Sequence, residues 1–262
     1  MHNLYGLIGF PLGHSFSKDY FEKKFKNENI KGEFRNFEID SLSNFKRIIE
    51  KNSYLRGLCV TIPYKESIMK YLSHISKEAK EIGAVNSIKI DRDINGNILT
   101  TGYNTDVYGF EYSLNAFIPD LKENKYKALI LGTGGASKAV KFVLNKLNIE
   151  FLEVSRYPND QQISYQETRK YINKFRIIIN CTPLGMFPNV DTFPPICYDD
   201  LGEQHYLYDL VYNPINTSFL EKGNLMGANT KNGLEMLYLQ AERSYYIWNN
   251  YSKNNSWVLY FI

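Results

Sequence analysis

The sequence is poor in cysteine and has no long apolar run, and each shortage excludes a class of protein. Among its 262 residues there are three cysteines, Cys59, Cys181 and Cys197. An odd number of widely spaced cysteines fits neither a disulfide framework nor a metal-ligand set. No segment reaches the roughly 18 uninterrupted apolar residues of a membrane span, and the first residues do not resemble a signal peptide. We therefore expect a protein of the cytoplasm.

The chain also lacks a large excess of charge of one sign. Its net charge is +3, and its lysines are interspersed with glutamates, a pattern that argues against nucleic acid as a partner. The four histidines do not have the spacing of metal ligands, so we expect no metal. The sequence leaves monomer and homodimer open.

Strands and helices alternate along the chain, which is typical of α/β proteins. The first part predicts strands over 4–9, 33–38 and 57–61, helices over 17–27, 43–51 and 65–71, and a hairpin turning at Asn95-Gly96. The second part predicts helices over 108–116 and 136–147, strands over 126–131, 150–154, 177–180 and 207–210, and a final helix over 234–249.

A glycine-rich turn follows the apolar stretch at 129–131 and leads into a helix. It contains Gly132, Gly134, Gly135 and Ala136, an arrangement that presents backbone N–H groups to a pyrophosphate. Ser137 stands where the third glycine of G-x-G-x-x-G is expected, so a plain strand-to-helix turn is the alternative. The next strand follows at the spacing of a β-α-β unit, and this setting favours a nucleotide cofactor.

The end of that next strand indicates which cofactor. NAD-binding proteins usually place an acidic residue there to accept a hydrogen bond from the ribose 2′-hydroxyl. This chain has Ser155 and Arg156 instead, and a hydroxyl beside a guanidinium suits a 2′-phosphate. The sequence therefore favours NADP (NADPH), with a solvated surface charge as the alternative role of Arg156.

We expect two lobes. The first, residues 1–106 with the C-terminal helix 234–262 packing back onto it, would be a substrate-binding and catalytic α/β domain. The second, residues 107–233, would be a Rossmann-like dinucleotide-binding domain. Two such lobes leave room for a substrate held by one to meet a cofactor held by the other.

Four short polar segments in the first lobe directly follow apolar stretches. They are 13–17, 60–65, 83–87 and 104–106. Their hydroxyls, amides, lysine and aspartate suit a small polyol that carries a carboxylate. Taken singly, each has a plainer explanation as a helix cap, a strand residue or a solvated cation.

Taken together and in this order, the motifs resemble the shikimate dehydrogenase family over essentially the whole chain. The motifs that carry the resemblance are 8–11, the four polar segments, 132–137, 180–186, 208–214 and 233–237 with Gln240-Ala241. The resemblance implies reversible NADP-linked reduction of 3-dehydroshikimate to shikimate, a step toward chorismate and the aromatic amino acids.

The resemblance also implies roles for single residues. Lys65 and Asp106 would form the catalytic pair. Ser15, Ser17 and Tyr212 would hold the substrate carboxylate, and Thr61, Asn86, Asp106 and Gln240 would bind its hydroxyls. For the cofactor, the turn from Gly132 to Ala136 would bind the pyrophosphate, Ser155 and Arg156 the 2′-phosphate, and Thr182, Leu210 and Gly233 would surround the nicotinamide.

Several positions depart from the family pattern. Lys18 stands where a proline is usual, Cys59 where an asparagine is usual, and Ser155 and Tyr157 replace the more common neighbours of Arg156. The departures near Arg156 keep open a quinate/shikimate dehydrogenase that prefers NAD. A non-catalytic sensor of shikimate-like ligands is a more distant alternative, since such a protein has no need of both Lys65 and Asp106.

Overall fold

The structure is a computed structural model that describes residues 3–13, 16–121 and 123–250. The chain divides into two compact units, Met1–Thr105 with Gln240–Ile262, and Asp106–Leu239. From the sequence, we expected the boundaries between residues 106 and 107 and between residues 233 and 234. The functions assigned to the two domains stay predictions. Within the described ranges, every helix is too short or too polar to span a bilayer.

The first unit is built on a mixed sheet with the strand order β2-β1-β3-β5-β6-β4. β1 pairs in parallel with β2 and β3, whereas β3 with β5 and β5 with β6 are antiparallel. Its elements are β1 (Asn3–Gly9), α1 (Phe16–Asn27), β2 (Gly32–Glu38), η1 (Leu42–Asn44), α2 (Phe45–Lys51), β3 (Leu55–Val60), η2 (Ser67–Tyr71), β4 (His74–Ile75), α3 (Lys77–Ile82), β5 (Ser87–Arg92) and β6 (Ile98–Tyr103).

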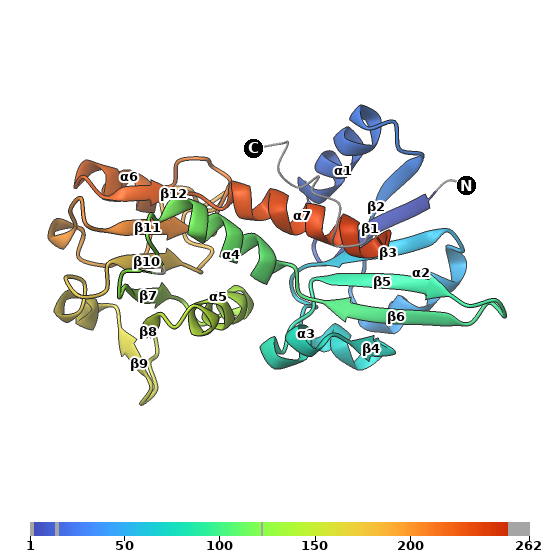
Figure 1. Cartoon of the computed structure of the whole chain (residues 1–262), viewed down its shortest axis with the longest axis horizontal. Coiled ribbons are helices and arrows are strands. Elements are labelled where there is room, and N and C mark those ends of the chain that lie inside the picture. The colour runs from blue at the N-terminus through green and yellow to red at the C-terminus, as the bar shows by residue number, and fades with distance from the viewer. Residues whose placement is uncertain (1–2, 14–15, 122, 251–262) are drawn as a thin grey trace. The chain divides into compact units, whose positions relative to one another are not determined.

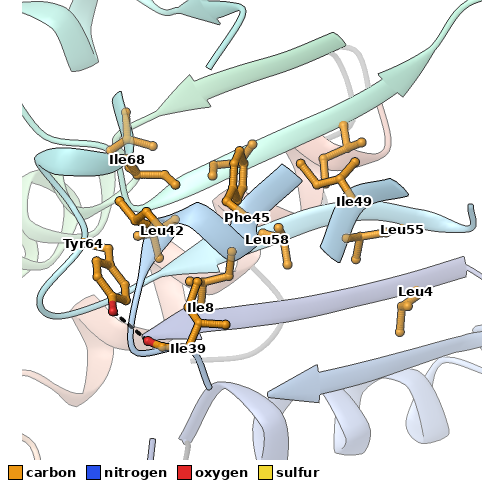
Figure 2. Packing of buried hydrophobic residues seen from close by; sticks show 14 of the residues in the cluster. Leu4, Ile8, Ile39, Leu42, Phe45, Ile49, Leu55, Leu58, Tyr64 and Ile68 are labelled. Carbon is orange, nitrogen blue, oxygen red and sulfur yellow. Dashed lines mark hydrogen bonds between the residues drawn. The ribbon is translucent and has the colours of Figure 1, made fainter. Parts of the chain in front are cut away.

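Both faces of this sheet are covered, which β1 shows most directly. Leu4 and Ile8 belong to a buried cluster with residues of η1, α2 and η2, whereas Tyr5 and Leu7 belong to a second cluster with residues of α1. This is the alternation expected of a strand between two apolar layers. Figure 2 shows the first cluster, where the Tyr64 hydroxyl donates a hydrogen bond of 2.7 Å to the Ile39 carbonyl.

The C-terminal half of α7 (Leu234–Trp248) completes the second cluster. The Trp248 ring stacks on Tyr5 with 5.3 Å between ring centroids. It also lies so close to β3 that a Cβ at Gly57 would be 2.2 Å from the indole. The predicted return of the final helix to the first lobe is therefore confirmed.

The second unit has a fully parallel sheet with the order β12-β11-β10-β7-β8-β9, which Figure 1 shows from top to bottom on its left side. If β7 is counted as strand 1, the order read from the β9 edge is 3-2-1-4-5-6, which is the strand order of dinucleotide-binding folds. The predicted Rossmann-like fold is therefore confirmed. Its elements are α4 (Asp106–Phe117), β7 (Lys127–Leu131), α5 (Gly135–Lys146), β8 (Glu150–Ser155), β9 (Gln162–Ser164), η3 (Gln166–Lys170), β10 (Ile177–Asn180), η4 (Tyr198–Asp200), β11 (Tyr206–Asp209), α6 (Ser218–Leu225), β12 (Asn229–Lys231) and the first turns of α7.

Three helical segments differ from the sequence expectations. The predicted helix over 65–71 is the short 3₁₀ piece η2, whose N-cap Glu66 makes no side-chain cap hydrogen bond; short segments often adopt this tighter form. The helices α3 and α6 were not predicted. Ser76 and Thr217 cap them by accepting from a backbone N–H group in the first turn of each helix, and such hydroxyls were the signal that could have found them.

Candidate active site

The topology of the first sheet explains why distant polar segments meet at one of its edges. β1 and β3 are parallel, so Phe10 and Thr61 follow strand ends on the same side. Because β5 runs opposite to β3 and β6 opposite to β5, Asn86 precedes β5 and Asn104 follows β6 on that side too. Three of the four predicted polar segments therefore lie along this edge, which we call the polar edge.

Hydrogen bonds tie the polar edge together. The Val85 N–H donates to the Lys65 carbonyl at 2.7 Å, and the Asn86 N–H donates to the Tyr103 carbonyl at 3.0 Å. The Asn86 side chain accepts from the Thr105 N–H at 2.6 Å. The backbones at Lys65, Asn86 and Thr105 thus lie side by side.

Gln240 joins the polar edge from α7, with 3.4 Å between its Oε1 and Asn86 Nδ2. Asp106 directly follows Thr105 and is the first residue of α4. The approach of the Lys65 and Asp106 side chains to a common reacting atom stays a prediction.

The structure describes only two of the three residues that the resemblance assigns to the substrate carboxylate. Ser17 lies in the first turn of α1 and is partly exposed, and Ser15 lies outside the described residues. Tyr212 belongs to the second unit, where burial raises the pKa of its phenol. Their binding role stays a prediction.

Two of the unusual residues have plain structural surroundings. Cys59 is 5% exposed and packs in the apolar cluster with the rings of Phe21 and Trp248, so an amide at this position would have to be buried against aromatic rings. Lys18 lies on the surface of α1, 3.7 Å from Glu22 one turn later. An exposed pair of this kind contributes little to stability.

In the second unit, the glycine turn after β7 has the geometry of a phosphate cradle. Gly132 has φ +96°, a conformation that favours glycine, and a Cβ there would lie 2.7 Å from Thr182 Cγ2. At Gly134 and Gly135, the space within 4 Å of the position that a Cβ would take is empty of other described residues. Since α5 begins at Gly135, the N–H groups of Gly135 and Ala136 are available to a ligand at the start of the helix, whereas the Ser137 N–H donates to the Gly134 carbonyl at 3.1 Å.

Ser137 fits this cradle despite the departure from the glycine pattern. It is fully buried, and its hydroxyl donates to the Gly134 carbonyl at 2.7 Å. The side chain thus ties the turn to the first turn of α5 and stays clear of the open side. The donor set of the turn therefore fits a pyrophosphate.

The end of β8 carries the residues expected at the 2′-phosphate. Ser155 accepts from the Tyr157 N–H at 3.2 Å, and Arg156 is exposed. Across the described parts of the chain we find no ion pair that engages the Arg156 guanidinium. An exposed guanidinium beside a hydroxyl at this strand end fits a phosphate monoester.

Gly233 is required for a reason that the sequence did not indicate. A Cβ at this position would lie 2.2 Å from the Leu210 carbonyl oxygen, so the glycine permits close packing of two backbone segments within the protein. Leu210, whose N–H donates to the Asn180 carbonyl, follows β11 at the carboxyl edge of the sheet. Both residues lie at the expected edge, and their contact with a nicotinamide stays a prediction.

A buried carboxylate with no predicted role holds this edge together. Asp209 is fully buried; its Oδ1 accepts from Asn180 Nδ2 at 2.9 Å and from the Val211 N–H at 3.0 Å, and its Oδ2 accepts from the Thr217 hydroxyl at 2.6 Å. Asn180 in turn accepts from the Thr182 hydroxyl. The strand ends of β10 and β11 are therefore cross-linked next to the switch point of the sheet, which lies between β7 and β10.

Asp209 makes stability depend on pH. Burial raises its pKa to about 6, against about 3.9 in an unfolded chain. Between these values the folded state binds more protons, so the free energy of unfolding falls as pH rises, by about 1 kcal/mol from pH 5 to 7. In Asp209→Asn, the amide can still accept from the Val211 N–H and donate to the Thr217 hydroxyl. We expect this substitution to abolish the contribution of Asp209 to the decrease in unfolding free energy.

Urea unfolding at pH 5 and pH 7 measures this effect. Asp191→Asn, which neutralises an exposed carboxylate in the same unit, is the control and is expected to keep the wild-type decrease. Equal decreases in wild type and Asp209→Asn would contradict the assignment.

A basic pocket of about 620 Å³ lies at the opposite edge of the same sheet. Its lining residues lie before or at the start of β7 and before β10, and they include Lys125, Lys127, Lys174 and Arg176. Ligands of parallel sheets of this order bind at the carboxyl ends of the strands, so we do not assign this pocket to the cofactor. Among the described residues, no three or more histidine, cysteine, aspartate or glutamate side chains are grouped so that they could hold a metal ion.

Similarity to known proteins extends over both units. The model of the shikimate dehydrogenase substrate binding domain matches residues 7–88. A shikimate dehydrogenase (NADP(+)) of Methanococcus maripaludis is 39% identical over 261 residues, covering 94% of this chain and 91% of the relative. A shikimate dehydrogenase (NADP(+)) of Clostridium beijerinckii is 38% identical, covering 96% of this chain and 93% of the relative.

A solved structure supports the same relationship. The crystal structure of a chorismate mutase/shikimate 5-dehydrogenase fusion protein from Clostridium acetobutylicum has a TM-score of 0.83 and 34% sequence identity, and covers 97% of this chain and 94% of that one. At this coverage the match extends over both units of the chain.

Proposed function

We propose that this chain, which belongs to the shikimate dehydrogenase family, catalyses the reversible NADP-dependent reduction of 3-dehydroshikimate to shikimate. The observation that carries the proposal is that similarity to shikimate dehydrogenases (NADP(+)) runs through both units. One unit has a polar edge suited to a polyol, and the other has a turn suited to a dinucleotide. The reaction belongs to the route to chorismate and the aromatic amino acids.

The residues of the polar edge supply the chemistry that a ketone reduction needs. NADPH supplies the hydride when bound. As negative charge develops on the carbonyl oxygen of the substrate, a cationic side chain must stabilise it and pass a proton to it. We assign this role to Lys65, with Asp106 orienting the ammonium group and binding the adjacent hydroxyl. In the oxidation of shikimate, Lys65 accepts the proton.

The remaining residues bind and orient the substrate. Thr61 and the amides of Asn86 and Gln240 would hold the ring hydroxyls, and Ser15, Ser17 and Tyr212 the carboxylate. Gly9 lacks a Cβ where one would lie 2.5 Å from Thr61 Cγ2, so close packing of two strand ends sets the position of Thr61. Orientation of this kind can contribute as much to rate as proton transfer does.

A spectrophotometric assay tests the proposal. Purified protein is incubated with shikimate or quinate and either NADP or NAD, and formation of the reduced cofactor is followed by absorbance. We expect the highest kcat/KM with shikimate and NADP. A preference for quinate and NAD would instead support a quinate/shikimate dehydrogenase, and absence of turnover with every pair would support a ligand sensor.

Removal of the Arg156 guanidinium tests the cofactor assignment. Because a charge-assisted hydrogen bond contributes about 1.5–3 kcal/mol, Arg156→Ala is expected to raise the KM for NADPH about 10- to 100-fold. The KM for NADH should not change, since NADH has no 2′-phosphate. Arg176→Ala removes an exposed arginine from the opposite edge of the same sheet and should leave both constants unchanged. An unchanged KM for NADPH in Arg156→Ala would remove the phosphate assignment.

The proposal also places the protein in the cell. Its three cysteines are free thiols in the structure, and two of them are buried. Reduced thiols and an NADPH-dependent biosynthetic step both suit the cytoplasm, which we propose as its location. Monomer and homodimer both fit the proposed reaction.

A further inference from the structure

The basic pocket at the edge of the second sheet where its strands begin has no part in the proposed reaction. Its volume of about 620 Å³ lies within the range of small-molecule sites. The net charge of the whole chain is only +3. Of the described residues that line the pocket, four are cationic and none is acidic: Asn124, Lys125, Tyr126, Lys127, Asn173, Lys174 and Arg176.

Two segments far apart in the sequence form this pocket because the strands that follow them are neighbours. β7 and β10 pair in parallel, with Ala128 beside Ile177. Lys127 and Arg176 each come one residue earlier, so both lie at the same edge of the sheet. The Tyr206 N–H, at the start of β11, donates to the Arg176 carbonyl at 2.8 Å and fixes the backbone there.

Most of the positive charge in the pocket is not balanced by carboxylates. Lys127 has a partner, because its Nζ lies 2.7 Å from Glu150 Oε2. Lys125, Lys174 and Arg176 are exposed, and among the residues that the structure describes we find no carboxylate in a salt bridge with any of them. Four lining cations less the one that Glu150 balances leave three uncompensated charges.

Uncharged polar groups complete the lining. Burial and the Tyr206 phenol raise the pKa of the Tyr126 phenol, whereas the Arg176 guanidinium lowers it, so this guanidinium lies near Tyr126. The amide side chains of Asn124 and Asn173 are exposed at the same place. The pocket therefore combines cations with hydroxyl and amide donors, a combination that suits the oxygens of phosphates and carboxylates.

We propose that this pocket binds a small anion that carries two or more phosphate or carboxylate groups, held by Lys125, Lys174 and Arg176. Cations held together in a concave site repel one another, and such a site raises the local concentration of anions. A ligand with about two or three negative charges would balance the uncompensated cations.

This site is separate from the proposed cofactor site. The residues assigned to the cofactor follow strands of the second sheet, whereas those of the pocket lie before or at the start of strands. The inference goes beyond the proposed function and does not depend on it.

Calorimetric titration of the whole protein tests the proposal. The probes are inorganic pyrophosphate, citrate and a single-stranded RNA oligonucleotide, each at about 0.15 M salt, where charges more than about 8 Å apart are largely screened. We expect saturable binding of one small anion per chain. Binding of pyrophosphate alone would identify a phosphate ligand, binding of citrate alone a carboxylate ligand, and binding of both the shared chemistry.

The double substitution Lys125→Ala/Lys174→Ala, which we call the pocket variant, removes two of the uncompensated charges. Both side chains are exposed, so the fold should be retained. We expect the Kd of the anion to rise about tenfold or more, because charge-assisted hydrogen bonds are lost. The control Lys46→Ala/Lys77→Ala removes the same charge from exposed positions of the first unit and should change the Kd less than about twofold.

Arg156→Ala separates this site from the cofactor site. If it weakens anion binding and the pocket variant does not, the anion binds at the cofactor site and the inference is overturned. Equal losses in the pocket variant and in the lysine control would also overturn it, since net charge alone would explain them.

The remaining outcomes are equally decisive. Binding of neither small anion would overturn the inference, and binding of RNA alone would replace the small anion with a nucleic acid. Because every measurement here is of binding, a protein that binds the anion but does not oxidise shikimate would overturn the proposed function and leave this inference standing.

Discussion

Lys65→Ala is expected to lower the turnover of shikimate at least about 100-fold, the scale of losing a general acid or base. Lys65 lies just before the short 3₁₀ segment η2, and its backbone is hydrogen-bonded to Val85 beside Asn86. The side chain therefore starts from the polar edge itself. In the proposed reaction, its loss would remove both a positive charge and a proton donor from the reacting oxygen.

Substrate binding should respond much less to this substitution. Most of the hydroxyls and amides assigned to shikimate come from other segments, so the dissociation constant for shikimate, measured by calorimetry, should change less than about tenfold. Such a split, with a large loss in kcat and a small change in affinity, is typical of a group that acts mainly in the transition state.

Lys70→Ala provides a matched control for Lys65→Ala. Lys70 lies in η2, a few residues after Lys65 in the chain, and its side chain is exposed. Its replacement alters the charge of the segment by the same amount, and we expect wild-type turnover. Near-normal turnover in Lys65→Ala, or an equal loss in both variants, would rule out the assigned role.

Much of the fold was predictable because its signals are local. Short apolar stretches marked β1, β3, β7, β10 and β11 to within about two residues. The glycine turn indicated both α5 and the position of the phosphate cradle, since a turn with φ +96° at Gly132 favours one residue type. The family motifs then located the polar edge, because its segments follow or precede strands that the pattern had already indicated.

The interactions that hold the site could not be predicted in the same way, because they join residues far apart in sequence. Thr105 and Ser244 are separated by 139 positions and meet only after α7 packs on the first sheet. Asp209 falls within one of the family motifs, but nothing local indicates that Asn180 and Thr217 share its carboxylate. Threonine, serine and asparagine are also common caps and turn residues, so their local explanation is usually sufficient.

The packing of α7 on the first unit is itself such a long-range feature. Trp248 is 3% exposed and contacts Tyr5, and the ring of Phe21 lies 5.4 Å away. Gly57 provides the flat surface on which the indole lies, since a Cβ at that position would be 2.2 Å from the ring. A tryptophan near the end of a helix and a glycine within a strand predict nothing about each other from sequence alone.

Trp248→Ala is therefore expected to destabilise the protein strongly. Removing a buried tryptophan costs about 3–5 kcal/mol of unfolding free energy. Gly57→Ala should also destabilise, by about 1–3 kcal/mol, since the added methyl group overlaps the indole and forces it to move. Urea unfolding of each single variant measures both losses.

The double variant tests whether the two residues act on one another. Once the indole is absent, the methyl group of Gly57→Ala enters the space that the ring occupied, so the second substitution should cost little or nothing. The coupling energy in the double-mutant cycle is expected to be about 1–3 kcal/mol. Gly13→Ala is the control, because it adds a methyl group where no atom lies within 4 Å and should be additive with Trp248→Ala.

Additive losses for Gly57→Ala and Trp248→Ala would mean that α7 does not lie on β3 as described. The position of Gln240 and Ser244 at the polar edge would then lose its support, because the same helix carries them there.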